Sequence, residues 1–196
     1  MVEHVKVLIA NDWRTWSDRI PWLAKMRGDL PMPARVGWVE IGWSWLGSFL
    51  GILLVAGLER LFFQDSDLIL LLGSFGASAV LIYGAPASPL AQPRNLILGH
   101  FISALIGVGA VKLLPGVTWL AAPLAVSLAI TAMHLTRSLH PPGGATALIA
   151  VIGSEQVRAL GFLYAFLPVL VATTLMLGLA LIFNNLIPSR RYPLWW

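Results

Sequence analysis

Six apolar stretches, separated by short segments rich in proline or charge, make up most of the chain. They cover residues 41–63, 68–85, 96–114, 118–136, 139–153 and 160–187. A helix needs about 20 apolar residues to cross the hydrocarbon core of a bilayer. The fifth stretch is therefore too short to cross easily by itself, whereas the sixth is long enough to cross with tilt. The pattern predicts an all-α integral membrane protein with about six transmembrane segments.

The basic residues favour a fifth segment that crosses the membrane over one that dips in and returns. Lys and Arg concentrate in short loops on the cytoplasmic side. With a crossing segment, only Arg60, Lys112 and Arg158 of the 13 basic residues lie on the outer side. With a re-entrant segment, Arg190 and Arg191 would lie outside as well. We therefore expect a multi-pass protein of a bacterial inner membrane with both termini in the cytoplasm.

The composition indicates which partners and activities to expect. Hydrophobic residues make up 58% of the chain, charged residues make up 11%, and the mean hydropathy is +0.80, so the lipid bilayer is an expected partner. The net charge of +4 comes from residues scattered over chain ends and loops, which argues against a nucleic-acid partner. The sequence has no cysteine, phosphate loop, dinucleotide fingerprint or Gly-x-Ser-x-Gly elbow. We expect neither enzyme activity nor a cofactor.

Residues 1–35 precede the first apolar stretch and differ from the expected transmembrane domain, residues 36–196. Large apolar side chains recur there at intervals of three and four residues, at Trp13, Trp16, Ile20 and Leu23. This spacing predicts an amphipathic helix in the membrane interface on the cytoplasmic side, followed by a linker. A docking site for a soluble partner is the alternative interpretation of the same helix.

An internal repeat divides the transmembrane domain in two. Residues 71–85 align with residues 139–153 at a constant offset of 68, and the same offset maps the first apolar stretch onto the fourth and the third onto the sixth. The repeats cover about 38–115 and 116–187, followed by a cytoplasmic tail, residues 188–196. With three spans in each repeat, the second copy is inverted in the membrane. Gly- or Pro-interrupted second and fifth segments predict broken or half helices, as in inverted-repeat transporters.

The small-residue runs within these two segments predict an anion site. A helix start carries unpaired N–H groups and a partial positive charge, so two facing starts near the bilayer midplane would hold a small anion. The expected substrate-binding residues are Ser74, Gly76, Ala77, Ser78, His140, Gly143, Gly144, Ala145 and Thr146. This arrangement predicts that Ser78 and Thr146 lie close together. Close packing between helices is the alternative explanation of the same small residues.

Further polar residues in or beside the spans are candidates for a pathway or gate: His100, His134, Arg137, Arg94 and Asn95. Ionisable groups at membrane depth are costly and usually line a cavity. The histidines lack the His-x-x-x-His spacing and an intramembrane carboxylate, so no metal site is expected. The proline-rich segment 88–95, which we expect to be extended, either gates the cytoplasmic mouth or simply closes a hairpin.

The motifs together resemble the HPP family of integral membrane proteins, named for His-Pro-Pro. The resemblance runs from about residue 35 to the C-terminus and rests on "GSFGASAVLIYGAPASPLAQPRN", "GH", "RSLHPPGGATAL" and "NNLIPSRRYP", which begin at Gly73, Gly99, Arg137 and Asn184. Members are usually described with fewer than six spans, and those of photosynthetic lineages are associated with nitrite transport. The family motif falls on His140 to Thr146.

The resemblance implies a permease or channel for a small inorganic anion, most of all nitrite. The residues alone do not distinguish nitrite from nitrate, formate or chloride. The alternative function is a non-transporting membrane scaffold or sensor that docks a cytoplasmic partner. A homo-oligomer is compatible with either function.

Overall fold

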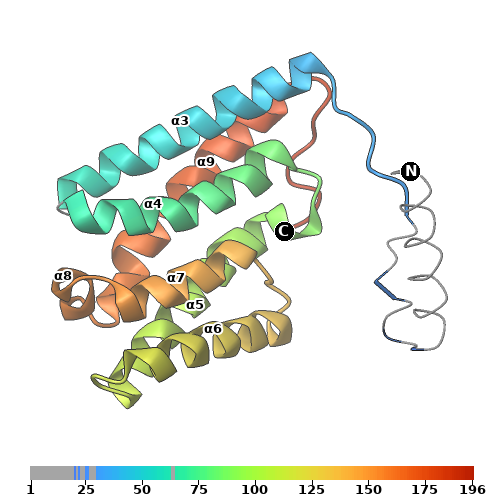
Figure 1. Ribbon diagram of the computed structural model, residues 1–196. Coiled ribbons are helices and arrows are strands. Elements are labelled where there is room, and N and C mark those ends of the chain that lie inside the picture. Colours follow the sequence, from blue (N-terminus) through green and yellow to red (C-terminus); the bar gives the residue numbers. More distant parts are fainter. Residues whose placement is uncertain (1–19, 21, 23–24, 27–29, 63–64) are drawn as a thin grey trace, which may run out of the picture. The chain divides into compact units, whose positions relative to one another are not determined.

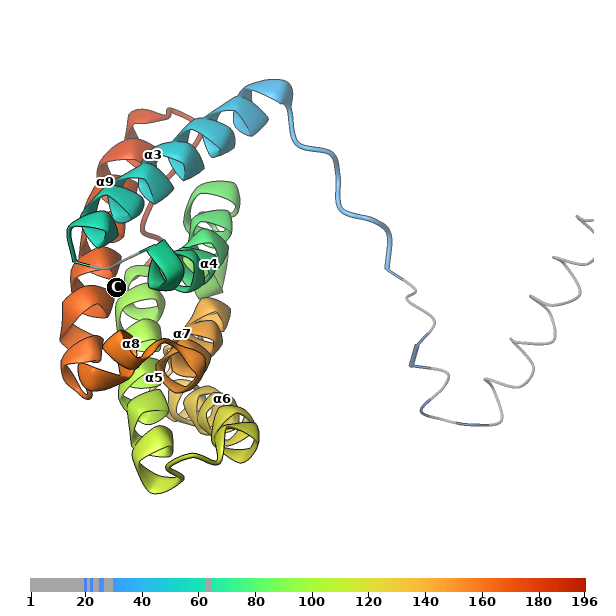
Figure 2. The same cartoon turned by 60° about the vertical axis from the view of Figure 1, so that its left-hand side comes forward.

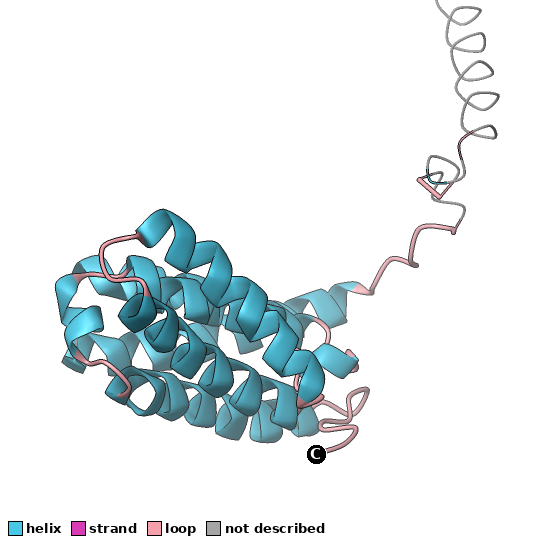
Figure 3. Ribbon diagram, turned by 90° about the horizontal axis from the view of Figure 1, so that it is seen from below, coloured by secondary structure: helices cyan, strands magenta, loops and turns pink. Residues whose placement is uncertain are grey.

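The computed structural model describes residues 20, 22, 25–26, 30–62 and 65–196. The chain divides into two units, Met1–Val36 and Gly37–Trp196. The amphipathic helix predicted within residues 1–35 falls largely outside the described residues. In the second unit the described residues form helices, turns and loops without a strand (Figure 3).

Six helical segments match the six apolar stretches in order. They are α3 (Trp38–Phe62), α4 (Asp65–Ala79) with the π-helix η1 (Val80–Gly84), α5 (Pro93–Leu113), α6 (Thr118–Leu135), α7 (Pro141–Ile152), and η3 (Ala165–Leu170) continued by α9 (Val171–Leu186). A 3-10 turn, η2 (Pro89–Ala91), precedes α5, and the short α8 (Glu155–Ala159) follows α7. The segment 88–95 is therefore not extended as predicted, because η2 and the first turn of α5 occupy most of it.

Four of the segments are long and apolar enough to cross a membrane: Trp38–Leu58, Pro93–Leu113, Thr118–Leu135 and Ala165–Leu186. Two shorter apolar helices, 72–84 and 141–152, accompany them. At 1.5 Å per residue α7 is only about 18 Å long, whereas a hydrocarbon core is about 30 Å thick. The integral membrane class is thus supported, while six full spans and the inverted arrangement remain predictions.

The helices pack in two groups that meet along α5 and α7. In one group α3 lies against α4 and α9, and in the other α6 lies against both α5 and α7 (Figures 1 and 2). The first group buries large side chains, among them Phe75, Tyr83 and Met176. The second is held by small ones, with Ala121, Ala125 and Ala129 one turn apart on α6. Small residues allow helices to approach closely where a bilayer provides no hydrophobic drive.

The C-terminal tail, residues 188–196, folds back onto the segment before α5. The Tyr192 hydroxyl donates to the carbonyl of Ala91 at 2.8 Å, and the Leu194 N–H donates to Oε1 of Gln92 at 2.8 Å. Burial raises the pKa of the Tyr192 phenol, so the hydroxyl keeps its proton and acts as a donor at neutral pH. We call this end of the bundle, where the tail lies, the tail end.

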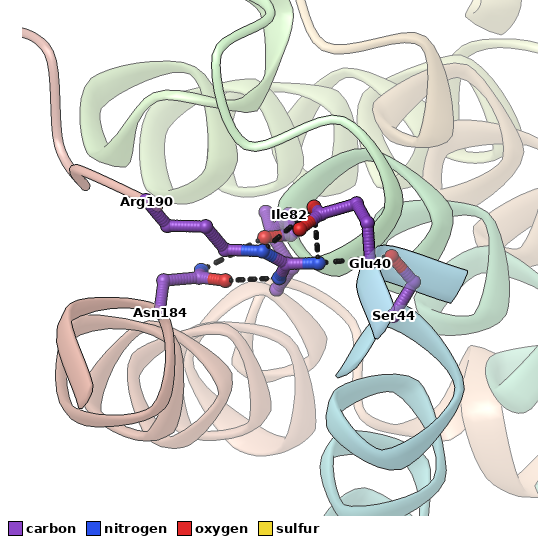
Figure 4. A network of polar contacts seen from close by, with 5 residues as sticks. All are labelled: Glu40, Ser44, Ile82, Asn184 and Arg190. Atoms are coloured by element: carbon purple, nitrogen blue, oxygen red, sulfur yellow. Dashed lines mark hydrogen bonds and ion pairs between the residues drawn. The ribbon is translucent and has the colours of Figure 1, made fainter. Parts of the chain in front are cut away.

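A buried arginine ties the tail to three helical segments (Figure 4). Arg190 donates from Nε to Glu40 Oε1 at 2.8 Å, from Nη2 to Ser44 Oγ at 2.9 Å, and from Nη1 to Asn184 Oδ1 at 2.8 Å. Asn184 in turn donates from Nδ2 to the carbonyl of Ile82 at 2.9 Å. The start of α3, η1 and the end of α9 are therefore joined by one charge-assisted network.

Candidate functional site

Five buried polar side chains form a continuous hydrogen-bonded chain between α4, α5 and α7. They are Ser74 and Ser78 of α4, His100 of α5, His140 at the N-cap of α7, and Thr146 of α7. Each is at most 1% exposed. We call this set the buried polar chain.

Ser78 and Thr146 hold the two ring nitrogens of one histidine. Ser78 Oγ lies 2.7 Å from His100 Nε2, and His100 Nδ1 lies 2.7 Å from Thr146 Oγ1. The second imidazole joins from the other side, with His140 Nε2 at 2.9 Å from Ser78 Oγ. Ser74 Oγ lies 2.7 Å from Thr146 Oγ1 and extends the chain by one hydroxyl.

Both ends of the buried polar chain terminate on backbone carbonyls. His140 Nδ1 lies 2.9 Å from the carbonyl oxygen of Leu90. Ser74 donates to the carbonyl of Pro142 at 2.8 Å. A carbonyl only accepts hydrogen bonds, so His140 must carry a proton on Nδ1.

Local geometry explains why these side chains converge. Ser74 and Ser78 are one turn apart on α4 and therefore lie on the same face of the helix. His100 is about 10 Å along α5 from its first residue, at 1.5 Å per residue. His140, which caps α7, reaches this same depth, so α7 begins inside the bundle. The predicted half helix at the fifth segment agrees with this geometry.

Two glycines permit the close approach of α5 and α7 at this depth. A Cβ atom on Gly99 would lie 2.6 Å from the Cβ of His140, and one on Gly143 would lie 2.7 Å from the carbonyl oxygen of Gly99. Neither position has room for a side chain. Gly143 therefore contributes by its size, which places His140 and Thr146 against α5.

The prediction of two facing helix starts is wrong for the first motif. Ser74 and Ser78 lie in the interior of α4, which begins at Asp65 and continues into η1. Helical N–H groups in that position are already bonded to carbonyls four residues earlier. Only the second motif opens a helix, at Pro141. Ser78 and Thr146 are nevertheless neighbours, because both bind the ring of His100.

Five of the nine predicted substrate-binding residues do not belong to the buried polar chain, and of these Gly143 acts only by permitting the close approach of α5 and α7. Ala77 is exposed and Gly76 is only partly buried, with no atom within 4 Å of where its Cβ would be. Gly144 and Ala145 instead line a mostly apolar pocket of about 510 Å³ between α6 and α7. Helical spacing explains this separation, since neighbouring residues of a helix point about 100° apart.

The other predicted pathway residues gather in a basic pocket at the tail end. The pocket has a volume of about 610 Å³ and is lined by Pro89, Leu90, Arg94, Asn95, Met133, His134, Arg137, Leu139 and Trp195. None of these residues is acidic. Helix α6 ends at Leu135, and Arg137 follows it with φ of +52°, so His134 and Arg137 do not share a helical face.

Leu90 is in contact with both the basic pocket and the buried polar chain. Leu90 lines the pocket and its carbonyl accepts the hydrogen bond from His140. Beside it, buried Asn95 donates from Nδ2 to the carbonyl of Leu139 at 2.7 Å. Its Oδ1 has no hydrogen-bond partner among the described residues. A buried acceptor without a donor is unusual and is a ready contact for a ligand or a water molecule.

Sequence reasoning missed the groups that support the chain from outside. Tyr164, at the break before α9, donates from its hydroxyl to the carbonyl of Thr146 at 3.2 Å. In the sequence it is one aromatic residue within a long apolar stretch and has no distinguishing pattern. The carbonyls of Leu90 and Pro142 have no side-chain signal at all.

Replacing Gly143 by alanine should destabilise the protein, whereas replacing its neighbour Gly144 should not. The new methyl at residue 143 would meet backbone, which cannot move cheaply, and overpacking of this kind costs about 1–3 kcal/mol. At residue 144 the methyl would be 3.8 Å from a Val126 methyl, and alanine favours a helix by up to about 1 kcal/mol. Unfolding of both variants in detergent, followed by circular dichroism, measures the difference. Equal stabilities would contradict the close α5–α7 contact.

Comparison with known proteins gives a family match over most of the chain. The sequence model of the family described as "HPP, transmembrane region" matches residues 33–193. Two transmembrane proteins of Dictyostelium discoideum are similar: one is 52% identical over 180 residues, 90% of this chain and 58% of the relative, and the other is 51% identical over 160 residues, 80% and 56% respectively. The chain thus spans less than two thirds of these relatives. No solved structure matches the chain.

Proposed function

This chain belongs to the HPP family of transmembrane proteins, and on that premise we propose that it is a permease or channel for a small inorganic anion, above all nitrite. The observation that carries the proposal is the buried polar chain beside the basic pocket. Imidazole and hydroxyl groups inside an apolar bundle are costly to bury and usually line a pathway. The choice of nitrite rests on the family resemblance.

The two parts of the site suit two stages of anion passage. Arg94 and Arg137 give the pocket a positive potential that attracts an anion from solution. Donors in the buried polar chain, none of which carries a permanent charge as lysine does, can then hold the anion reversibly, which permits release. In the described structure these donors bond to one another. An anion would therefore enter by replacing a contact such as that between Ser78 and one imidazole.

An inverted repeat with six crossings is part of the proposal. The six segments run in alternating directions along the bundle, with the start of α3 and the end of α9 both at the tail end (Figure 1). Ser74 and Pro142, which are equivalent at the offset of 68, are in direct contact. Ser78 and Thr146 are also equivalent, and they bind opposite nitrogens of His100. Such contacts between equivalent positions are expected beside a two-fold axis near the middle of the membrane.

The basic residues support a cytoplasmic tail end. Arg94, Arg137, Arg190 and Arg191 lie there, whereas Arg60, Lys112 and Arg158 lie at or near the opposite helix ends. The rule that Lys and Arg favour the cytoplasmic side then places both ends of the six-segment unit in the cytoplasm.

Uptake into proteoliposomes tests the function. Purified protein should import nitrite faster than empty liposomes do, and nitrate, formate and chloride in parallel assays define the selectivity. Absence of flux for every anion, from protein with native circular dichroism, would contradict the proposal and favour the scaffold or sensor alternative.

Neutralising the basic pocket should weaken capture of the anion without preventing its passage. Each of Arg94→Gln and Arg137→Gln is expected to raise the half-saturating nitrite concentration about fivefold, the equivalent of ~1 kcal/mol for one partly screened charge. The effect should shrink as salt is raised. Arg191→Gln, an exposed arginine outside the pocket, is the matched control. If the half-saturating nitrite concentration is unchanged in both pocket variants, the basic pocket is not on the route of the anion.

A further inference from the structure

The buried polar chain contains more hydrogen bonds than its neutral side chains can supply. Six contacts of 2.7–2.9 Å connect the carbonyl of Leu90 through the five side chains to the carbonyl of Pro142. Each hydrogen bond requires one proton. A neutral histidine, serine or threonine contributes one proton each, so five side chains provide five. The neutral chain is therefore one proton short.

The missing proton can be placed by following the contacts from one end. Ser74 donates to Pro142, so Thr146 must donate to Ser74 and His100 must donate from Nδ1 to Thr146. If His100 Nε2 accepts from Ser78, the serine oxygen has to accept from His140 Nε2, whereas the reverse orientation of Ser78 would place the second proton on His100 instead. Because His140 also donates from Nδ1 to Leu90, it carries two protons in the first orientation and is a cation. The two longer contacts, from Ser78 to Ser74 O and from Thr146 to Pro142 O at 3.4 Å, add only acceptors.

No described residue next to the chain offers a negative charge to balance that cation. The neighbouring ionisable groups are Tyr164 before α9, His134 of α6, and the two arginines of the basic pocket. Phe75 of α4 packs on the ring of His100. Glu40 of α3 is paired with Arg190, and Lys112 lies against Phe162 near the end away from the tail. A buried cation without a partner is unfavourable, so the proton needs an accompanying anion.

We propose that the buried polar chain binds one proton together with each anion, so that the protein is an electroneutral proton–anion symporter. This inference rests on the proposed function. The proton comes from water on one side, resides on the His140–Ser78–His100 segment while the anion is bound, and returns to water on the other side. The proton completes the hydrogen bonding and the anion balances the charge, so each favours binding of the other.

Simultaneous recording of nitrite and proton uptake tests the coupling. Proteoliposomes loaded with a pH-sensitive dye are given nitrite while a potassium gradient with valinomycin sets the voltage, and empty liposomes give the background leak of nitrous acid. We expect one proton per nitrite and the same initial rate at either sign of voltage. If nitrite enters without protons and at a rate that depends on the voltage, the proton symport is wrong but the proposed anion transport is not. Absence of flux for all anions would contradict the proposed function itself.

Ser74→Ala is the sharpest variant, because it removes one proton donor and two of the six contacts. Four short contacts and four protons remain, so the neutral chain becomes fully paired and an extra proton gains nothing. We expect the proton-to-nitrite ratio to fall below one and the remaining flux to become sensitive to voltage. Ser103 is a buried serine of α5 whose hydroxyl makes its one hydrogen bond among the described residues to the sulfur of Met133, and Ser103→Ala should keep a ratio of one. If both variants have the same proton-to-nitrite ratio, the transported proton is not the one missing from the hydrogen bonds of the buried polar chain.

A second readout detects the proton without requiring transport. Nitrogen NMR of protein labelled at its four histidines, in nanodiscs, distinguishes a neutral ring from an imidazolium, and His4→Gln and His134→Gln remove the two signals from outside the chain. Saturating nitrite should convert one ring of the His100 and His140 pair to imidazolium. Two neutral rings at saturating nitrite would overturn the inference.

Discussion

Glu40→Ala is expected to cause the largest loss of stability of any single substitution proposed for this chain. The side chain of Arg190 is 3% exposed, and Glu40 carries the only carboxylate that pairs with it among the described residues. Removing one partner of a buried ion pair costs about 3–5 kcal/mol, because the remaining charge stays buried without compensation. Ser44 and Asn184 still accept from the guanidinium, so we expect the lower end, about 3 kcal/mol. Equilibrium unfolding in mixed detergent micelles measures the loss.

Two further variants separate the charge from the shape of the Arg190 network. Glu40→Gln keeps an acceptor oxygen near Arg190 and should lose clearly less stability than Glu40→Ala. Arg191→Ala removes the exposed neighbouring arginine and should stay within about 0.5 kcal/mol of the unmodified protein, as surface substitutions usually do. If Glu40→Ala is as stable as Arg191→Ala, the tail is not anchored by this ion pair.

Ser78→Ala should lower the initial rate of nitrite uptake at least about tenfold. Its hydroxyl is the one described hydrogen-bonding link between the two imidazoles, and its removal leaves both His100 Nε2 and His140 Nε2 without a hydrogen-bond partner among the described residues. An unsatisfied buried polar group costs about 1–3 kcal/mol, and tenfold in rate corresponds to ~1.4 kcal/mol. Uptake into proteoliposomes at matched protein content is the measurement.

A serine of α5, Ser103, which lies one turn from His100, supplies the control for Ser78→Ala. Ser103→Ala removes the same atoms from an equally buried position in the same bundle but outside the buried polar chain. It should keep at least about half of the uptake, because its weak contact with a thioether sulfur contributes little. Equal losses in the two variants would mean that the chain serves only to hold the helices together.

The helices of this protein follow closely from its sequence, because their ends coincide with breaks in the apolar pattern. The stretches 96–114 and 118–136 became α5 (Pro93–Leu113) and α6 (Thr118–Leu135), with Pro93 opening the first and the segment 114–117 separating them. Glycine is ambiguous by contrast. Gly73 and Gly76 suggested a helix start, yet α4 passes through both. Neither glycine is at a close helix contact, and a membrane helix tolerates glycine because its backbone hydrogen bonds are made within the helix.

The features that sequence analysis did not predict depend on contacts between residues that are far apart in the chain. Arg190 was one of two arginines in a tail, and only the fold brings it to Glu40, 150 residues away. Ser78 and Thr146 lie close together as predicted, because both contact the ring of His100. The sequence analysis had named His100 only as a pathway or gate residue. Periodicity indicates which face of a helix is buried, whereas the partner across the interface depends on the register between helices.

Nitrite protection of a cysteine at residue 146 tests most directly whether the anion passes through the buried polar chain. The chain has no native cysteine, so Thr146→Cys and the off-chain control Ser103→Cys each carry a single thiol. Both are treated with a small anionic methanethiosulfonate in proteoliposomes that transport nitrite. We expect that Thr146→Cys reacts, that nitrite slows the reaction in a saturable way, and that the reaction of Ser103→Cys is unaffected by nitrite. If nitrite leaves the labelling of Thr146→Cys unchanged in protein that still transports nitrite, the anion does not pass through the buried polar chain.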